Sequence, residues 1–183
     1  DLDILKKRAI EDSKISVVDQ TEEYFCLIVT GPKSRKLLTK ISDADLALPW
    51  LSLQWVKILN KDVLLARVSY AGELGWEIHV RKQDLREVYD LVISEGATPF
   101  GMFALDSLRV EKGYRAWKGD LSTDYTILES GLDRFVKFDK AQVFTGKDSL
   151  LKEKQRGVAK KFVTMIVEGN DCDAPYMSTV MFE

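Results

Sequence analysis

Tyr70 and Glu77 are the residues whose types and spacing best support ligand chemistry, and they lie in two neighbouring strand-like segments. Residues 63–70 and 74–80 are rich in β-branched, aromatic and aliphatic side chains, which favours β-strands. The glycines at their junction supply the backbone freedom that a tight or bulged connection requires. We therefore predict a β-hairpin that fixes the Glu77 carboxylate on a rigid strand, with the Tyr70 hydroxyl at the end of the neighbouring strand.

Alternation in the second strand predicts which of its side chains share a face. Its even positions are apolar: Leu74, Trp76, Ile78 and Val80. Glu77 and His79 are therefore expected to project from the opposite face. A rigid carboxylate beside a phenol suits a flat heterocycle with several N–H donors, and a half-solvated sheet face without a ligand is the alternative. His79 is the only histidine, and no second group lies at a spacing that favours general-base catalysis.

Three sequence blocks carry a family resemblance. Tyr-Ala-Gly-Glu-Leu-Gly-Trp-Glu-Ile at 70–78 resembles the signature hairpin of the folate-binding aminomethyltransferase family, which includes the glycine-cleavage T-protein and the C-terminal halves of dimethylglycine and sarcosine dehydrogenases. Ala-Leu-Asp-Ser-Leu-Arg-Val-Glu at 104–111 is similar to the family's Ala-x-Asp-Ser-Leu-Arg-x-Glu helix. The segments at 126–132 and 144–147 resemble its Pro-x-Glu-x-Gly-Leu and Phe-x-Gly-Lys motifs. The blocks follow the family's order from about residue 27 to residue 167.

The resemblance implies roles for individual side chains. Glu77 corresponds to the glutamate that accepts hydrogen bonds from the N–H edge of a reduced pterin, and Tyr70 to a tyrosine of the same pocket. Tyr114 lies where the family often has an aromatic residue that stacks near the folate, and Trp117 could do the same or pack in the core. Arg109 is either a ligand contact or the partner of the aspartate three residues earlier on the helix, and intrahelical pairs of this kind are common.

Leu105 is the main departure from the T-protein pattern. T-proteins have an arginine at this position that helps to hold the folate, whereas the dimethylglycine- and sarcosine-dehydrogenase branch has an uncharged residue. A leucine cannot pair with a carboxylate of the glutamate tail, so that contact is lost or moved. The family's catalytic aspartate has no counterpart in this chain, and we therefore expect a binding half-pocket with no catalytic residue of its own.

The function that the resemblance implies is tetrahydrofolate-dependent transfer of a one-carbon unit from a small amine, such as dimethylglycine or sarcosine, or from a lipoyl-bound aminomethyl donor. FAD would belong only to a missing N-terminal domain, if one is present. Two alternatives remain open at this stage: a folate-binding module without catalysis, and a structural part of a flavoenzyme subunit. The sequence does not give the oligomeric state.

Composition excludes several other classes. The chain of 183 residues has a net charge of −2, with 45% hydrophobic and 31% charged residues, and gives no reason to propose nucleic-acid or membrane binding. No apolar run approaches the ~20 residues of a membrane span. Cys26 lies in an apolar run and is read as a core residue, and two dissimilar cysteines fit a reducing compartment: the cytoplasm, or the mitochondrial matrix in a eukaryote. With one histidine and no Cys/His motif, we predict no metal site.

Periodicity predicts an α+β fold, with a mainly antiparallel sheet and packed helices. The expected helices are 3–12, 84–95, 100–112, one after Pro32 and one opened by a capping box at 145–148. The expected strands are 24–30, 53–59, 63–70, 74–80 and 162–167, and residues 114–132 form a long irregular stretch. We expect a partial folate-binding domain at 1–140 that lacks its N-terminal part. A linker helix and the first strand of a truncated C-terminal β-barrel would follow at 141–183.

Overall fold

The computed structural model describes residues 1–12, 14–166 and 168. The chain divides into two compact units, Asp1–Tyr114 and Arg115–Glu183. The predicted domain boundary at residue 140 stays a prediction, because a compact unit need not coincide with a sequence domain.

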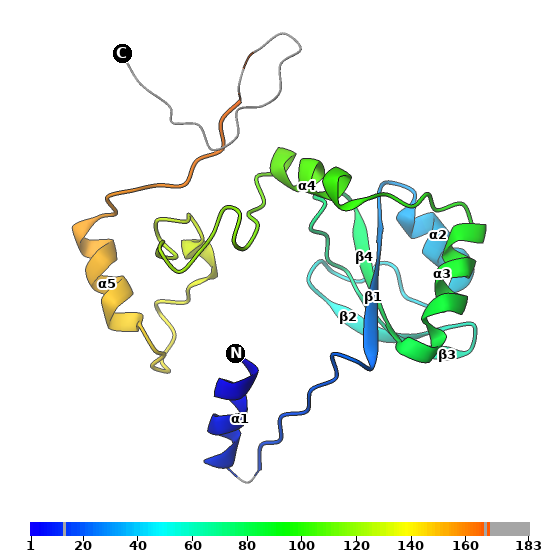
Figure 1. Cartoon of the computed structure of the whole chain (residues 1–183), viewed down its shortest axis with the longest axis horizontal. Coiled ribbons are helices and arrows are strands. Elements are labelled where there is room, and N and C mark those ends of the chain that lie inside the picture. The colour runs from blue at the N-terminus through cyan, green and yellow to red at the C-terminus, as the bar shows by residue number, and fades with distance from the viewer. Residues whose placement is uncertain (13, 167, 169–183) are drawn as a thin grey trace. The chain divides into compact units, whose positions relative to one another are not determined.

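The first unit is built on a four-stranded antiparallel sheet of order β1-β4-β3-β2 (Figure 1). Its strands are β1 (Tyr24–Thr30), β2 (Leu53–Ile58), β3 (Lys61–Ala66) and β4 (Gly75–Arg81). β4 is central: it pairs along its whole length with β1 and through three residue pairs with β3. The predicted α+β class with a mainly antiparallel sheet is confirmed, as is the pairing of the two signature strands.

The signature strands differ from the prediction at their ends. β3 stops at Ala66, so the connection to β4 is the longer loop 67–74 rather than the expected tight or bulged connection. The tight turn lies instead between β2 and β3, at Leu59 and Asn60, whose φ values are 52° and 61°. Two consecutive positive φ angles match the right-handed twist of a two-residue hairpin. This turn is shorter than the connection at 60–62 that the expected strands 53–59 and 63–70 leave between them.

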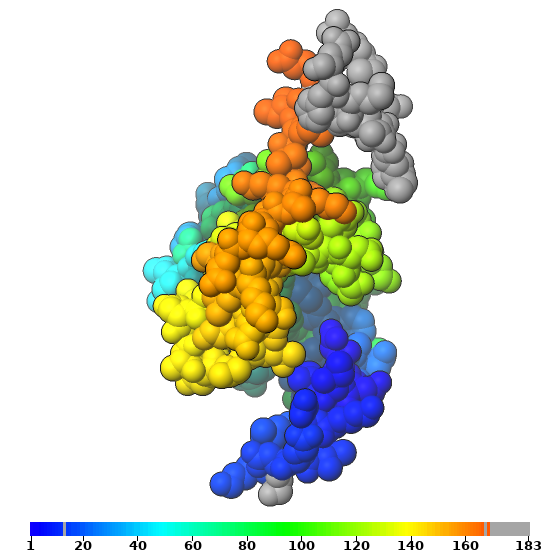
Figure 2. All heavy atoms as spheres, turned by 90° about the vertical axis from the view of Figure 1, so that its left-hand side faces the viewer, coloured from blue at the N-terminus to red at the C-terminus, as the bar shows by residue number. Residues whose placement is uncertain are grey.

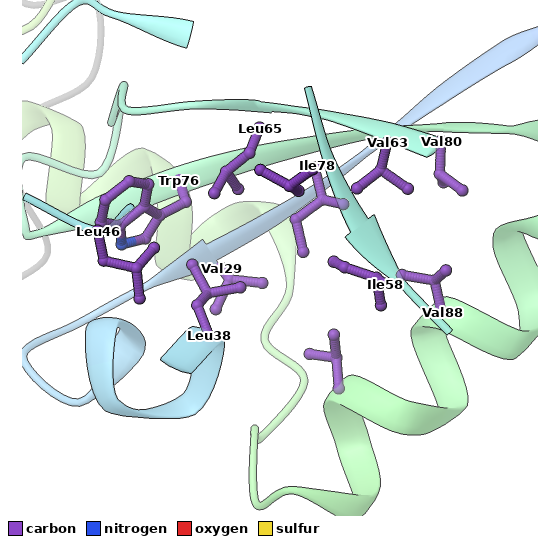
Figure 3. Packing of buried hydrophobic residues seen from close by; sticks show 12 residues of the cluster. Val29, Leu38, Leu46, Ile58, Val63, Leu65, Trp76, Ile78, Val80 and Val88 are labelled. Carbon is purple, nitrogen blue, oxygen red and sulfur yellow. The ribbon is translucent and has the colours of Figure 1, made fainter. Parts of the chain in front are cut away.

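Two helices cover one face of the sheet and close the core around Trp76, Ile78 and Val80 (Figure 3). They are α2 (Ser34–Ile41) and α3 (Leu85–Ser94), and the short 3-10 helix η1 (Lys82–Asp84) leads into α3. The three β4 side chains are fully buried. The predicted helix at 84–95 is confirmed within one residue, because its apolar residues repeat at the period of a helix whose one face packs on a sheet.

α1 (Leu2–Ile10) and α4 (Met102–Glu111) complete the helices of the first unit. α4 begins two residues later than predicted because Gly101, its N-cap, has an extended backbone (φ −91°, ψ 171°). At its other end Gly113 has a φ of 72° and the Tyr114 N–H donates to the Arg109 carbonyl at 2.8 Å. Such a left-handed glycine just past a helix reverses the chain, and it sets the place of the residue that follows.

The second unit contains the irregular stretch that was predicted, then η2 (Asp133–Phe135) and α5 (Lys147–Arg156). α5 lies beside the segment that precedes it (Figure 2): Thr126 Oγ1 donates to Glu153 Oε1 at 2.7 Å, and the Lys154 ammonium lies 4.6 Å from the centre of the Phe138 ring. Glu153 is buried by this packing.

Two predictions for the second unit are wrong. The capping box at 145–148 does not form, because Gly146 is the N-cap of α5 with φ 90° and the helix start has no side-chain cap. Residues 162–166 are irregular rather than a strand, and residue 167 lies outside the described residues. The described residues thus show no start of a β-barrel. No helix in the described part of the chain is both long and apolar enough to cross a membrane.

Candidate functional site

Tyr70 and Tyr114, two predicted site residues from distant parts of the sequence, stack on each other in the first unit. Their ring centroids are 6.2 Å apart and the rings are inclined by 14°. Tyr70 lies in the loop between β3 and β4, and Tyr114 follows the end of α4. Because both rings are only partly buried, the pair presents aromatic surface to solvent.

Arg109 holds the second of these tyrosines. Its guanidinium is buried; Nε donates to Asp106 Oδ1 at 2.7 Å, and Nη1 donates to the Tyr114 carbonyl oxygen at 3.0 Å. The predicted intrahelical pair with Asp106 is therefore confirmed. The contact with Tyr114 makes Arg109 a residue that positions the aromatic pair.

Gly72 lets the loop between β3 and β4 approach the end of α4. Its φ is 78°, and a Cβ added there would lie 2.6 Å from Cγ of Lys112. Only a glycine fits both the left-handed backbone and this contact. The first and second blocks of the family resemblance are thus packed against each other, and this contact brings Tyr70 and Tyr114 together.

Glu77 is fixed by hydrogen-bonded strands on both sides. Its register partners are Ile28 on β1 and Ala66 on β3. The side chain projects from the face opposite the core, as predicted, and is 32% exposed to solvent. His79, two residues later on the same face, places Nε2 at 3.0 Å from Glu77 Oε2.

Cys26 is a site residue that the sequence interpretation missed. It is opposite His79 in the β1–β4 ladder and is exposed, so its expected place in the core is wrong. The pKa of its thiol is raised to about 11, first by partial burial of the sulfur and then by the negative charge of Glu77 and a hydrogen bond to that carboxylate. A protonated thiol, an imidazole and a carboxylate therefore meet on one surface of the sheet.

Two predicted residues remain, Trp117 and Leu105. Trp117 belongs to the second unit, where it forms an isolated β-bridge with Leu121. Its side chain is 63% exposed, so the alternative that it packs in the core is wrong. Leu105 is buried and lines a cavity of about 800 Å³ between β1, α2, α3 and the segment 96–102. Tyr70, Glu77 and Tyr114 do not line this cavity.

The comparison with protein families decides the classification. Residues 1–140 match the family described as the GCVT N-terminal domain. The chain belongs to this family. The resemblance to the folate-binding aminomethyltransferases is thereby confirmed.

Relatives of the GCVT chain come from two branches. It is 34% identical over 181 residues to the dimethylglycine dehydrogenase of Homo sapiens, covering 94% of this chain and 21% of that protein. It is 35% identical over 163 residues to an aminomethyltransferase of Halothermothrix orenii, covering 86% of this chain and 45% of that protein. The chain therefore spans about a fifth of the length of the dehydrogenases and less than half of the aminomethyltransferase.

A solved structure supports the GCVT fold. Aminomethyltransferase T of the glycine cleavage system from Bartonella henselae matches with a TM-score of 0.66 and 26% sequence identity, over 73% of this chain and 37% of that one. The antiparallel sheet with packed helices is therefore the fold of that protein in the region they share.

Proposed function

We propose that this GCVT chain forms the pterin-recognition part of a domain for tetrahydrofolate-dependent one-carbon transfer. The observation that supports this most directly is the position of Glu77, a half-exposed carboxylate on the central strand of the sheet. Both strands that flank it restrain its backbone, so a ligand would meet a fixed acceptor. Binding to a preorganised group loses little free energy to ordering of the protein.

The hydrogen-bonding groups of the site fit a reduced pterin. The exocyclic amine and ring N–H of a pterin lie along one edge, and a carboxylate accepts both in charge-assisted hydrogen bonds. Each carboxylate oxygen accepts more than one hydrogen bond, so the contacts of Glu77 with His79 and with the Cys26 thiol leave capacity for the ligand. The Tyr70–Tyr114 pair would cover an apolar ring of the ligand, and Arg109 would keep Tyr114 in place.

Tetrahydrofolate, when bound, supplies the N5/N10 acceptor for the one-carbon unit. The residues of this chain would orient that acceptor and limit the access of water to a reactive formaldehyde equivalent. The proposed donor is a small secondary or tertiary amine, such as sarcosine or dimethylglycine. Leu105 supports this choice over a lipoyl-bound aminomethyl group, because the resemblance gives an uncharged residue at this position to the dimethylglycine- and sarcosine-dehydrogenase branch and an arginine to the T-proteins.

FAD, where the parent enzyme is a dehydrogenase, would be held by residues outside this chain. The folate-binding domain would end near residue 140, and the following residues would connect it to a C-terminal β-barrel. We propose the cytoplasm, or the mitochondrial matrix in a eukaryote, because several relatives are named as mitochondrial proteins.

Titration of the chain with 5-formyltetrahydrofolate tests the proposal. Glu77→Gln keeps the shape and removes the charge, so it should weaken binding by about 1.5–3 kcal/mol, which is roughly a 10- to 150-fold rise in Kd. Glu73→Gln is the matched control, because Glu73 is an exposed glutamate of the loop before β4. Equal affinity of Glu77→Gln and the parent would remove Glu77 from the site.

A further inference from the structure

Cys26, Glu77 and His79 bring three different metal-ligating groups together on the open face of the sheet. The thiol sulfur, a carboxylate oxygen and an imidazole nitrogen all lie within 4.8 Å of one another. In the part of the chain that the structure describes, no other three such side chains approach this closely. Oε2 of Glu77 and Nε2 of His79 are 3.0 Å apart.

The backbone positions of the three residues are fixed by one ladder of paired strands. Glu77 and His79 are two apart on β4, so their side chains leave the same face. Cys26 is the register partner of His79 on β1, and the β1–β4 pairing continues for several residues on either side. Bringing the three donors onto one ion therefore requires rotation of side chains and no movement of the sheet.

The distances match what a tetrahedral ion would require. Zinc binds thiolate at about 2.3 Å and imidazole or carboxylate at about 2.0–2.2 Å, so ligand atoms around it lie about 3.3–3.6 Å apart. The Glu77–His79 contact would open by a few tenths of an ångström and the longer separations would shorten by about 1 Å. Side-chain torsions allow both changes because all three groups are partly exposed.

The ligand types select the class of ion. A thiolate with an imidazole suits a borderline metal such as Zn²⁺ or Co²⁺, whereas Mg²⁺ and Ca²⁺ prefer sets of oxygen atoms. Three protein ligands leave the fourth position for water or a small anion, as in zinc sites that exchange ligands. One thiolate and one carboxylate would balance the charge of a divalent ion.

We propose that Cys26, Glu77 and His79 form a binding site for a divalent zinc-type ion on this face of the sheet. Binding replaces the thiol hydrogen with the metal and releases that proton to the solvent. The ion also takes the Glu77 oxygen that now contacts His79.

With Glu77 as the pterin acceptor of the proposed function, the metal site and the folate site share one carboxylate. Glu77 cannot present its carboxylate to a pterin edge while the same group ligates an ion. Metal and folate would therefore exclude each other, and Zn²⁺ would act as a competitive inhibitor of folate binding. The metal site itself does not depend on folate and can be tested alone.

Cobalt spectroscopy on the chain with Cys172→Ser provides the test, because this background leaves Cys26 as the only thiol. Added Co²⁺ should produce a thiolate-to-cobalt charge-transfer band and the intense d–d bands of a four-coordinate ion, and Zn²⁺ should abolish both. Cys26→Ser should remove the charge-transfer band. His79→Gln and Glu77→Gln should each raise the Kd for Co²⁺ at least ~10-fold, because losing only a residue that supports a metal ligand already costs about 10- to 100-fold and these variants change a ligand itself.

Glu73→Gln is the control for lost negative charge and should leave the spectrum and the affinity unchanged. Absence of a charge-transfer band with millimolar Co²⁺ would overturn the site, and so would a band that survives Cys26→Ser. Circular dichroism of each variant shows whether it is folded, and the three ligand variants test the site independently. A parent that binds Co²⁺ but no 5-formyltetrahydrofolate would reject the proposed function and leave the metal site standing.

Discussion

Arg109 donates a hydrogen bond to the backbone carbonyl of Tyr114 at 3.0 Å while the same guanidinium pairs with Asp106. This side chain lies in the helix block that resembles the family motif. It links the helix to the residue that stacks on Tyr70. Binding of a flat ligand by the tyrosines would therefore depend on an arginine behind them.

Replacing Arg109 should weaken both the fold and the aromatic pair. Arg109→Met keeps the apolar stem and removes the hydrogen bonds, including the one that satisfies the Tyr114 carbonyl. We expect a loss of about 1–3 kcal/mol in the free energy of unfolding in urea, the usual cost of unpairing such groups. Arg86→Met, which removes an exposed pair with Asp90, is the control and should leave the urea midpoint unchanged within error. Equal effects of the two variants would contradict the positioning role.

Gly72→Ala should disturb the contact between the β3–β4 loop and α4. The new Cβ would meet Lys112 at 2.6 Å with the backbone at φ 78°. We expect a destabilisation of about 1–3 kcal/mol, measured by urea unfolding. Gly96→Ala measures the cost of the left-handed backbone alone, because Gly96 has φ 97° and nothing lies within 4 Å of its added Cβ. The Gly72 variant should cost more than this control, and a smaller cost would show that the loop has room to move.

Cys26 should react slowly with thiol reagents at neutral pH. Its pKa is raised to about 11, so the protonated form predominates below that value and the reactive thiolate forms only as the pH rises towards it. In metal-free buffer on the Cys172→Ser background, the rate of alkylation should still increase with pH above 10. Glu77→Gln should lower the pKa and accelerate the reaction at pH 7.5, although burial, the larger cause, remains. A rate that levels off near pH 9 would contradict the shielding of this thiol.

Leu105→Ala should affect stability and leave folate recognition almost unchanged. Leu105 is 8% exposed and lines an existing cavity, so truncation removes apolar contact that the surroundings cannot fully restore. We expect a loss of about 2–3 kcal/mol in the free energy of unfolding, at the low end for a buried leucine. The Kd for 5-formyltetrahydrofolate should change less than threefold, because no polar contact is lost. A large change in this Kd would place Leu105 at the ligand.

The sequence predicted the helices and strands whose apolar residues repeat at a regular spacing. It missed features that depend on which residues of two paired strands lie opposite each other. The α3 segment and the alternation of β4 were predictable, and with them the shared face of Glu77 and His79. The role of Cys26 was not, because an apolar run does not reveal which residue of another strand it will face. The start of α5 was misplaced because Thr145 has a suitable side chain for a cap, whereas the backbone uses Gly146 in a left-handed conformation.

The central place of β4 gives the two parts of the proposed pocket different resistance to local opening. Glu77 lies on a strand that is paired on both sides, so the ladder that its N–H joins protects its amide from hydrogen exchange and both neighbouring strands restrain its backbone. Tyr114 is retained by a helix end and one arginine. On mild warming the aromatic stack should separate while the carboxylate is still in place. On warming, the ability of the two tyrosines to stack on a ligand ring would therefore be lost first. The amide of Glu77 would still be protected from hydrogen exchange at that temperature.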